Sequence, residues 1–315
     1  MVYYMIKIVV LTLLLNIFIY FYLNKYKDNK QPIYDLGPSW HQKKGQTPTK
    51  GGIIFITPLL ISLFLMAIYF HSIIYLLIFL AILFSFLLGL KDDNDKIKYH
   101  DNQKGLSPKK KLLVQFLIGL MFVIFYLLNT SQYNFFIISL ILLFPFVLTG
   151  FSNATNFTDG LDGLCTSISI IVFSTLGIIA YQQGNLLIIP IIVLLIGLLM
   201  FLLINKNPAK MFMGDTGSLA IGVFFAICIY QLNIVILGIF LGLTYIIEIV
   251  SVVLQVSFFK YTKNKYGEGR RLFKMAPLHH HFEKMNFSEN KIVILFSIFQ
   301  LMISFIVLYF GGYLM

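Results

Sequence analysis

The chain consists of long runs of apolar residues that alternate with short polar segments. A run such as "IIVLLIGLLMFLLI", residues 191–204, is apolar on every face, whereas a membrane-spanning β-strand alternates apolar and polar positions. A helix needs about 20 apolar residues to cross a bilayer. The pattern therefore predicts ten membrane-spanning helices, at residues 3–23, 52–70, 72–90, 112–128, 135–151, 165–181, 186–204, 217–231, 233–258 and 292–312.

Two of these predicted spans are unusual. The first, 3–23, has no small-residue cleavage site and is followed by charged residues. We interpret it as a retained span and not as a signal peptide. The ninth, 233–258, is longer than a bilayer requires and contains Glu248, so we expect it to tilt, to break or to leave the membrane.

The composition agrees with a lipid environment. Hydrophobic residues make up 58% of the chain and charged residues 12%, compared with about 45–50% and about 25% in soluble domains. Cys165 and Cys228 fall at or inside apolar runs, which favours buried hydrophobic side chains over a disulfide or a metal site. We predict an all-α polytopic integral membrane protein with one domain, residues 1–315.

The basic residues indicate which way the spans face. Of the 24 Lys and Arg residues, 23 lie in four segments between predicted spans, at 24–51, 91–111, 205–216 and 259–291. Positive residues favour the cytoplasmic side of a membrane. These four segments are therefore predicted to be cytoplasmic, with both termini outside.

The acidic residues are expected on the same side. Of the 13 Asp and Glu residues, 10 fall in these four segments, and Asp159 and Asp162 fall in segment 152–164, which the alternation of spans places on the same side. Glu248 is the exception. A transporter or channel usually needs polar residues along a path through the membrane, and the predicted spans hold almost no charge. The distribution favours an enzyme with an active-site cleft at the cytoplasmic surface.

The first acidic motif is "LKDDNDKIK", residues 90–98. Asp92 and Asp93 are adjacent, and Lys96 follows one helical turn later. Paired carboxylates can hold Mg²⁺, which prefers oxygen ligands. Adjacent residues point about 100° apart on a helix, so one acid can face the site while the other supports it. A polar helix end is the alternative interpretation.

The second acidic motif is "NATNFTDGLDGL", residues 153–164. Asn153, Asn156, Asp159 and Asp162 recur every three residues, which places them along one helical face or turn. The interleaved glycines allow close approach of a ligand. A simple linker does not explain so regular a pattern, and we expect a functional site here.

A third acid stands before a predicted span. Asp215 lies between Gly214 and Gly217 in "MGDTGS", where a carboxylate can hold a cation while the helix N-terminus faces anionic oxygens. The segment "GQTPTKGG", residues 45–52, enters another span with an accessible backbone and a lysine. Alone, this segment is better explained as a common loop that starts a helix.

Three consecutive histidines occur in "MAPLHHHFE", residues 275–283. Chelating histidines are usually spaced three to five residues apart, so three adjacent rings do not suit one zinc ion. More than thirty residues follow the triplet, which argues against a purification tag. A loop that contacts phosphate or moves a proton is the remaining interpretation, with Arg270 and Arg271 as further phosphate partners.

Together the motifs supply acids for Mg²⁺, cations for phosphate groups, and His and Asn side chains for recognition. This combination indicates phosphoryl transfer between a soluble diphosphate donor and a lipid acceptor. Mg²⁺ would neutralise charge that develops on the diphosphate.

"KDDNDK", "NATNFTDGLDGL", "MGDTGS" and "APLHHHFE", in this order, resemble the polyprenyl-phosphate N-acetylhexosamine-1-phosphate transferase superfamily. Within it, "MAPLHHHFE" with "TPTKGG" is similar to the phospho-N-acetylmuramoyl-pentapeptide transferase family. The resemblance covers essentially the whole chain. It implies Mg²⁺-dependent transfer from UDP-MurNAc-pentapeptide to undecaprenyl phosphate, giving lipid I and UMP. It also implies ten spans, a bacterial plasma membrane and a homodimer, and no nucleic acid partner is expected.

The resemblance also implies roles for single residues. Asp215 is the expected Mg²⁺ ligand, and Asp92, Asp93 and Asp159 are expected catalytic acids, with His280 as the histidine that faces the substrate. The expected substrate-binding residues are Lys44, Lys96, Asn153, Asn156, Gly160, Leu161, Asp162, Asn205, Phe212, Gln255, His279 and His281. The chain departs from the family at Lys91, where an apolar residue is usual, and at Asn94 and Asp95, where an aromatic is common.

Three alternatives remain open at this stage. A sister enzyme would use UDP-N-acetylglucosamine as donor. The triple histidine and the basic residues that precede it argue against this alternative. A lipid or nucleotide-sugar transporter would move substrate without releasing UMP. The transfer itself, for which we favour direct attack by the lipid phosphate, could also proceed through an aspartyl-phosphate.

Overall fold

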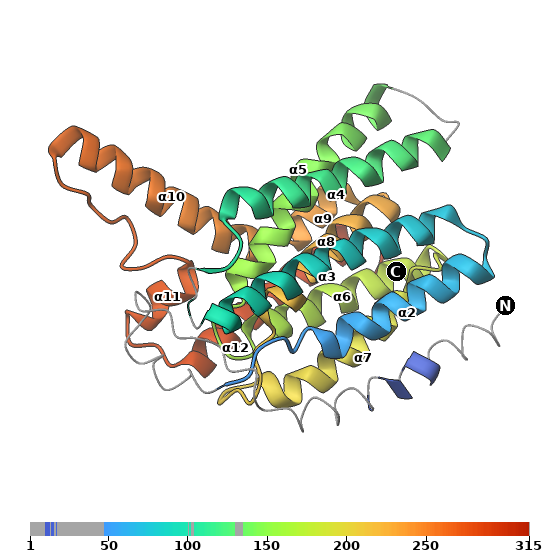
Figure 1. Ribbon diagram of the computed structural model, residues 1–315, viewed down its shortest axis with the longest axis horizontal. Coiled ribbons are helices and arrows are strands. Elements are labelled where there is room, and N and C mark those ends of the chain that lie inside the picture. The colour runs from blue at the N-terminus through green and yellow to red at the C-terminus, as the bar shows by residue number, and fades with distance from the viewer. Residues whose placement is uncertain are drawn as a thin grey trace.

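A computed structural model describes residues 47–99, 101, 104–129 and 135–314, and residues 10–12, 14, 15 and 17 of the first predicted span. Figure 1 shows the helical bundle that these residues form. Its helices are α2 (Ile53–Tyr69), α3 (Ile73–Tyr99), α4 (Pro108–Asn129), α5 (Phe135–Thr158), α6 (Leu164–Gln182), α7 (Ile188–Asn205), α8 (Gly214–Gln231), α9 (Val235–Leu241), α10 (Leu243–Tyr266), α11 (Leu278–Glu283) and α12 (Glu289–Phe310).

The helices confirm a polytopic membrane protein. Seven of them, α3, α4, α6, α7, α8, α10 and α12, are long and apolar enough to cross a bilayer, and α2 is apolar but only 17 residues long. The predicted span 3–23 lies largely outside the described residues.

Two helices run further than the apolar pattern predicts. α3 continues to Tyr99 instead of ending near residue 90, and α5 continues to Thr158 instead of ending near residue 151. The end of an apolar run marks where a helix reaches the polar surface, and the helical backbone can continue beyond that point because its hydrogen bonds are internal. Both acidic motifs therefore begin on rigid helix extensions.

The ninth predicted span breaks at Gly242, which separates α9 from α10. A Cβ atom at Gly242 would lie 2.3 Å from the ring of Phe151 on α5. The absence of a side chain at Gly242 leaves room for that ring, so α5 packs closely against the chain at the point where α9 ends and α10 begins. This outcome is one of the three that the excess length of the span allowed.

α8 lies at the centre of the bundle and is buried along almost its whole length. Neighbouring helices approach its backbone through glycines, as is common between membrane helices. A Cβ at Gly89 of α3 would lie 2.2 Å from the carbonyl oxygen of Asp215. One at Gly222 of α8 would lie 2.3 Å from the carbonyl oxygen of Phe151. α3 therefore approaches the start of α8 closely, and α5 approaches its middle closely.

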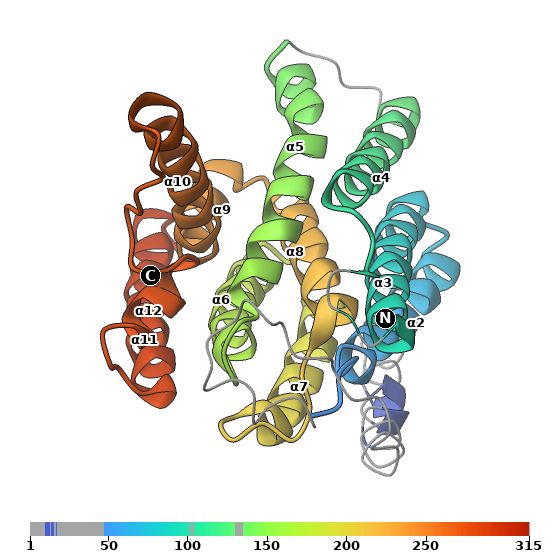
Figure 2. The same cartoon turned by 60° about the vertical axis from the view of Figure 1, so that its left-hand side comes forward.

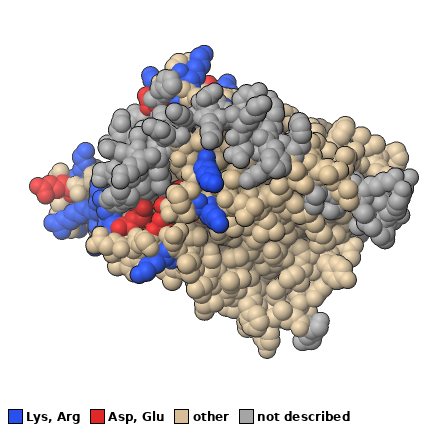
Figure 3. All heavy atoms as spheres, turned by 90° about the horizontal axis from the view of Figure 1, so that it is seen from below, with Lys and Arg blue, Asp and Glu red and all other residues tan. Residues whose placement is uncertain are grey.

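The other helices flank this centre on two sides. In Figure 2, α2, α3 and α4 lie on one side of α8, and α9 to α12 lie on the other side, beyond α5 and α6. Part of α10 projects from the bundle in Figure 1. On the face drawn in Figure 3, the charged side chains gather toward one end and most of the remaining described surface is uncharged.

The close approach at Gly222 predicts a strong effect of a single methyl group. Gly222→Ala should lower the unfolding temperature in detergent by several degrees, because α5 and α8 must separate and overpacking costs about 1–3 kcal/mol. Gly150→Ala on α5 is the matched control, since nothing lies within 4 Å of a Cβ there, and it should leave the unfolding temperature unchanged or raise it. Equal effects of the two changes would contradict the packing described.

Candidate functional site

The carboxylates of Asp92, Asp93 and Asp215 form an acidic cluster at the junction of α3 and α8. One oxygen from each residue lies within 4.8 Å of the others. All three residues are buried, with 0%, 3% and 8% of their surface exposed. Three carboxylates this close repel one another unless cations or N–H groups surround them, so the neighbours of each oxygen decide what it can do.

Asp93 caps the N-terminus of α8. Its carboxylate accepts hydrogen bonds from the backbone N–H groups of Asp215 (3.1 Å) and Thr216 (3.0 Å), and from the Thr216 hydroxyl (2.6 Å). These N–H groups belong to the first turn of a buried helix and have no partner within it. The negative charge also suits the positive end of the helix dipole. Asp93 therefore holds Asp215 in place.

Asp92 and Asp215 instead face two ammonium groups. Lys96 Nζ lies 2.7 Å from the Asp92 carboxylate and 3.3 Å from that of Asp215. Lys111 Nζ lies 2.7 Å and 2.5 Å from the same two groups. Each lysine therefore bridges both acids. Asn156 on α5 adds a hydrogen bond to Asp215 (2.9 Å).

The cluster has the donor set of a divalent cation site. Carboxylate oxygens are the ligands that Mg²⁺ prefers, and Asp92 and Asp215 each contact two lysine ammonium groups. One oxygen of Asp92 also accepts the backbone N–H of Leu106 (2.6 Å). These two acids could therefore exchange an ammonium group for a metal ion, whereas Asp93 is committed to the start of α8. A resident cation would supply charge neutralisation for bound phosphate oxygens.

Lys111 is a site residue that the sequence analysis did not identify. It is the last of three consecutive lysines at the start of α4, and Lys109 and Lys110 are exposed. The sequence alone does not separate the three lysines, and the structure shows that Lys111 stands four residues before Gln115, which is fully buried. Residues four apart lie on the same helix face, so the third lysine continues the buried stripe of α4.

Asp159 lies beside the acidic cluster, in the loop that follows α5. Burial raises the pKa of its carboxyl well above the ordinary range, and the charges of Asp215 and Asp93 raise it further. A hydrogen bond from the backbone N–H of Gly214 offsets part of this rise in the pKa of Asp159. A cation bound at the cluster would also favour the ionised form.

Asp162 and Asn205, two of the predicted substrate-binding residues, shape the loop before α8. Asp162 accepts hydrogen bonds from the Ala209 backbone (2.9 Å) and the Asn207 side chain (3.1 Å). Asn205 accepts one from the Thr166 hydroxyl (2.6 Å) and donates one to the Met211 carbonyl (3.0 Å). Their side chains hold the loop that carries the next residues.

Phe212 lies in that loop and is half-buried, and its neighbour Met213 is fully buried. Its backbone N–H donates to the Pro48 carbonyl, and its carbonyl accepts from the Gly51 N–H, both at 2.8 Å. The motif before α2 and the motif before α8 are therefore paired side by side. Lys44 lies outside the described residues.

Some predicted site residues lie away from the acidic cluster. Asn153 donates hydrogen bonds to the Gln115 side chain (2.6 Å) and to the Thr149 carbonyl (2.8 Å), so it joins α5 to α4. Gln255 on α10 binds the backbone of Leu272 and Phe273. It anchors the segment that leads into the triple-histidine motif.

The three histidine rings have three different partners. His279 Nδ1 lies 2.9 Å from the carboxylate of Glu248 on α10, and both side chains are fully buried. His280 Nδ1 lies 2.6 Å from Glu283 one turn later, with part of its side chain exposed. His281 Nδ1 accepts the backbone N–H of Lys274 (3.1 Å). The role of Glu248, which the sequence left open, is to hold His279.

Gly160 connects the histidine motif to the acidic loop. A Cβ atom at Gly160 would lie 2.2 Å from His279 Nε2, so the ring fits directly against the backbone next to Asp159. His279 Nε2 is buried and has no hydrogen-bond partner among the described residues. The pair of Glu248 and His279 thus packs α10 and α11 against the loop of the second acidic motif. Leu161, the next residue, is buried.

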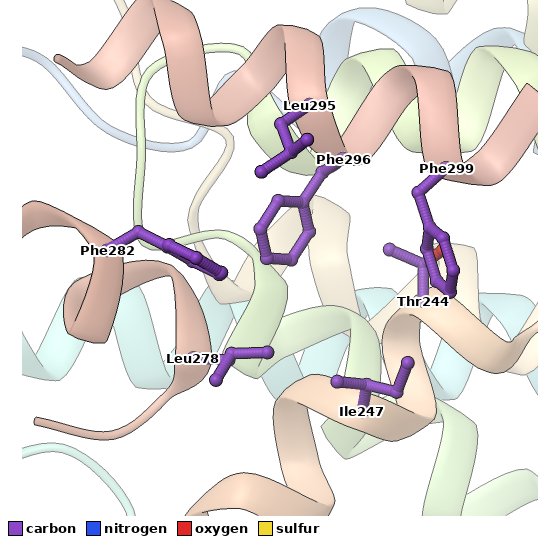
Figure 4. A pocket seen from close by; sticks show the side chains of 7 residues that line it. All are labelled: Thr244, Ile247, Leu278, Phe282, Leu295, Phe296 and Phe299. Atoms are coloured by element: carbon purple, nitrogen blue, oxygen red, sulfur yellow. The ribbon is translucent and has the colours of Figure 1, made fainter. Parts of the chain in front are cut away.

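An apolar pocket of about 270 Å³ adjoins α11. Figure 4 shows Leu278 and Phe282 of α11 facing Phe296 and Phe299 of α12, with Ile247 of α10 below them. Thr244 and Leu295 complete the lining. The lining is apolar apart from Thr244, and its residue Leu278 immediately precedes His279 in the chain.

Comparison with known proteins shows the family to which the chain belongs. The profile described as glycosyl transferase family 4 matches residues 75–233, about half of the chain. A relative from Wolbachia sp. subsp. Drosophila simulans is 42% identical over 296 residues, which cover 90% of both chains. Others from Campylobacter jejuni and Staphylococcus aureus are 40% and 43% identical, over 88% and 84% of this chain and 85% of their own.

The chain therefore belongs to glycosyl transferase family 4, a family of membrane phosphotransferases. All three relatives bear the name phospho-N-acetylmuramoyl-pentapeptide-transferase, and they resemble this chain over nearly its full length. The resemblance seen in the motifs is thus confirmed, as is the expectation of an enzyme.

The buried Glu248–His279 pair predicts different effects of two substitutions. Glu248→Gln keeps an acceptor for the His279 ring and should change the unfolding temperature little. Glu248→Leu leaves the buried Nδ1–H without a partner, which costs about 1–3 kcal/mol, and should lower the unfolding temperature in detergent by several degrees. A Leu variant as stable as the Gln variant would show that the pair does not hold α10 and α11 together.

Proposed function

We propose that the protein transfers phospho-N-acetylmuramoyl-pentapeptide from UDP-MurNAc-pentapeptide to undecaprenyl phosphate, giving lipid I and UMP with Mg²⁺ as cofactor. The observation that carries this proposal is the similarity at 42% identity over 90% of both chains to a relative of that name. The acidic cluster supports it, because Asp92 of α3 and Asp215 of α8 share two lysines, Lys96 and Lys111.

The roles of the acids follow from their neighbours. Asp215 is the proposed Mg²⁺ ligand, supported by Asn156 and fixed at the start of α8 by the Asp93 cap. Asp92 is the acid proposed to orient or deprotonate the lipid phosphate, because its carboxylate faces side-chain cations and is free of α8. Lys96 and Lys111 are proposed to bind phosphate oxygens that displace the carboxylates.

Direct attack is the route that we favour. An oxygen of the lipid phosphate forms a bond to the sugar-linked phosphorus while the bond to the UMP oxygen breaks. His280, the histidine whose side chain is partly exposed, is proposed to contact the diphosphate, with His279 and His281 as its supports. The uridine group of the donor is proposed to bind between the loops of Gly160–Asp162 and Asn205–Phe212, with the Phe212 ring as a stacking face.

The proposal includes the number of membrane spans and the side of the membrane on which the site lies. Ten spans with both termini outside would place the acidic cluster and the histidine motif on the cytoplasmic face of a bacterial plasma membrane. The apolar pocket beside α11 (Figure 4) suits part of the polyprenyl chain of the acceptor. We also propose a homodimer.

The metal assignment is tested by reconstituted transfer. Purified protein with UDP-MurNAc-pentapeptide, undecaprenyl phosphate and Mg²⁺ should form a lipid-linked product and release UMP. Asp215→Asn should lower kcat by about 100-fold or more, and excess chelator should abolish turnover. Full activity under either condition would exclude Asp215 as the metal ligand.

Donor competition separates the proposal from its alternatives. UDP-N-acetylglucosamine should neither compete nor support transfer, whereas a sister enzyme would use it. A transporter would move substrate into vesicles without releasing UMP. An aspartyl-phosphate route would release UMP from the donor in the absence of the lipid acceptor.

The bridging lysine at position 111 gives a further prediction. Lys111→Met should lower kcat by about 100-fold, because one cation facing the transferred phosphate is lost. Lys109→Met changes an exposed lysine two positions away and should retain wild-type turnover. If both variants kept full activity, Lys111 would be only a counter-ion of the folded protein.

A further inference from the structure

A second feature of α3 and α4 lies outside the acidic cluster. The two helices form an apolar groove of about 380 Å³ on their outer surface. α3 contributes Phe84, Leu87 and Leu88, and α4 contributes Val114, Leu117, Ile118 and Met121. Leu88 and Ile118 are buried, whereas Phe84, Leu87 and Leu117 are among the exposed large hydrophobic residues. The groove therefore has a closed floor and an open, lipid-facing side.

Each of the two helices carries one lysine just beyond the apolar residues of the groove, on the same face. On α3, Leu87 and Leu88 are followed by Lys91, which itself lines the groove. On α4, Val114 is preceded four residues earlier by Lys110. Residues three or four apart share a helix face, so both lysines extend the groove-facing stripes.

These two lysines differ from the pair that enters the acidic cluster. Lys91 and Lys110 are exposed, and neither has a hydrogen bond or ion pair with any part of the chain that the structure describes. Lys96 and Lys111 on the same helices are largely buried and bridge Asp92 and Asp215. α3 and α4 thus direct one lysine each inward to carboxylates and one outward to the surface.

The depth of the outward lysines matches a lipid headgroup. Lys91 is 18 residues after Ile73, the first residue of α3, which corresponds to about 27 Å along the helix. Lys110 is at a similar distance from Asn129, the end of α4. The hydrocarbon core of a bilayer is about 30 Å thick, so both ammonium groups reach the level of the phosphates.

We infer that this groove binds one anionic phospholipid, with an acyl chain along Phe84, Leu87 and Leu117 and its phosphate between Lys91 and Lys110. Basic residues at the cytoplasmic end of a groove between membrane helices favour anionic headgroups. The lipid is not the reacting acceptor, because Asp92 and Asp93 turn away from this surface toward α8. The inference does not depend on the proposed transferase activity.

Native mass spectrometry of the purified full-length protein in a neutral detergent tests the site. The probes are phosphatidylglycerol and phosphatidylcholine with identical acyl chains. Wild-type protein should retain the first phosphatidylglycerol more tightly than phosphatidylcholine. Lys91→Ala/Lys110→Ala should lower phosphatidylglycerol affinity roughly 10- to 30-fold and leave phosphatidylcholine affinity unchanged.

Two further variants separate the groove from general surface charge. Lys260→Ala/Lys263→Ala removes two exposed lysines from α10 and should leave phosphatidylglycerol binding unchanged. Leu117→Trp fills the apolar part of the groove and should weaken binding of both lipids. Equal losses in the two lysine double variants would overturn the inference, as would unchanged binding in Lys91→Ala/Lys110→Ala.

Transfer kinetics distinguish the two sources of an anionic lipid. In the Lys91→Ala/Lys110→Ala variant, the KM for undecaprenyl phosphate should equal that of the wild type. A raised KM for this acceptor would assign the groove to the reacting lipid and overturn the inference. Loss of all transfer in the wild-type protein would contradict the proposed function but would leave the lipid-binding result intact.

Discussion

The buried start of α8 is the constraint on which the rest of the site depends. A helix that begins inside a protein has several N–H groups that water cannot reach. Asp93 satisfies two of them and the Thr216 hydroxyl. Because this carboxylate comes from α3, the same interaction sets the register between the two helices and fixes the direction of Asp215. Gly89 allows the approach, since any larger residue would meet the Asp215 backbone.

Much of the fold could be predicted because a segment that crosses lipid must be apolar and helical. Apolar runs located the helices, and the excess length of the ninth run correctly suggested an irregularity. The break falls at Gly242, against which the ring of Phe151 packs from a distant part of the chain, and no local pattern contains that contact. The extensions of α3 and α5 were missed for a related reason, because hydropathy marks where the membrane ends and not where the helix ends.

The acids of the candidate site were identified by motif, but the different contacts that each acid makes were not. Asp92 and Asp93 are neighbours in sequence, and only the position of α8 shows that one caps a helix while the other faces lysines. Lys111 was hidden in a run of three lysines whose members look equivalent until the buried face of α4 is known. Glu248 and His279 are 31 residues apart, and their contact requires α10 and α11 to pack together.

The continuation of α3 beyond its apolar run has a consequence for the membrane itself. Asp92 lies on the same rigid helix as the span, about 28 Å from its start. Its height above the bilayer midplane is therefore fixed by the protein, whereas the height of a lipid phosphate is fixed by the thickness of the hydrocarbon layer. Under the proposed function, the two heights must match for reaction. Acyl-chain length then becomes a determinant of turnover, since a thicker or thinner bilayer shifts the phosphate relative to the carboxylate.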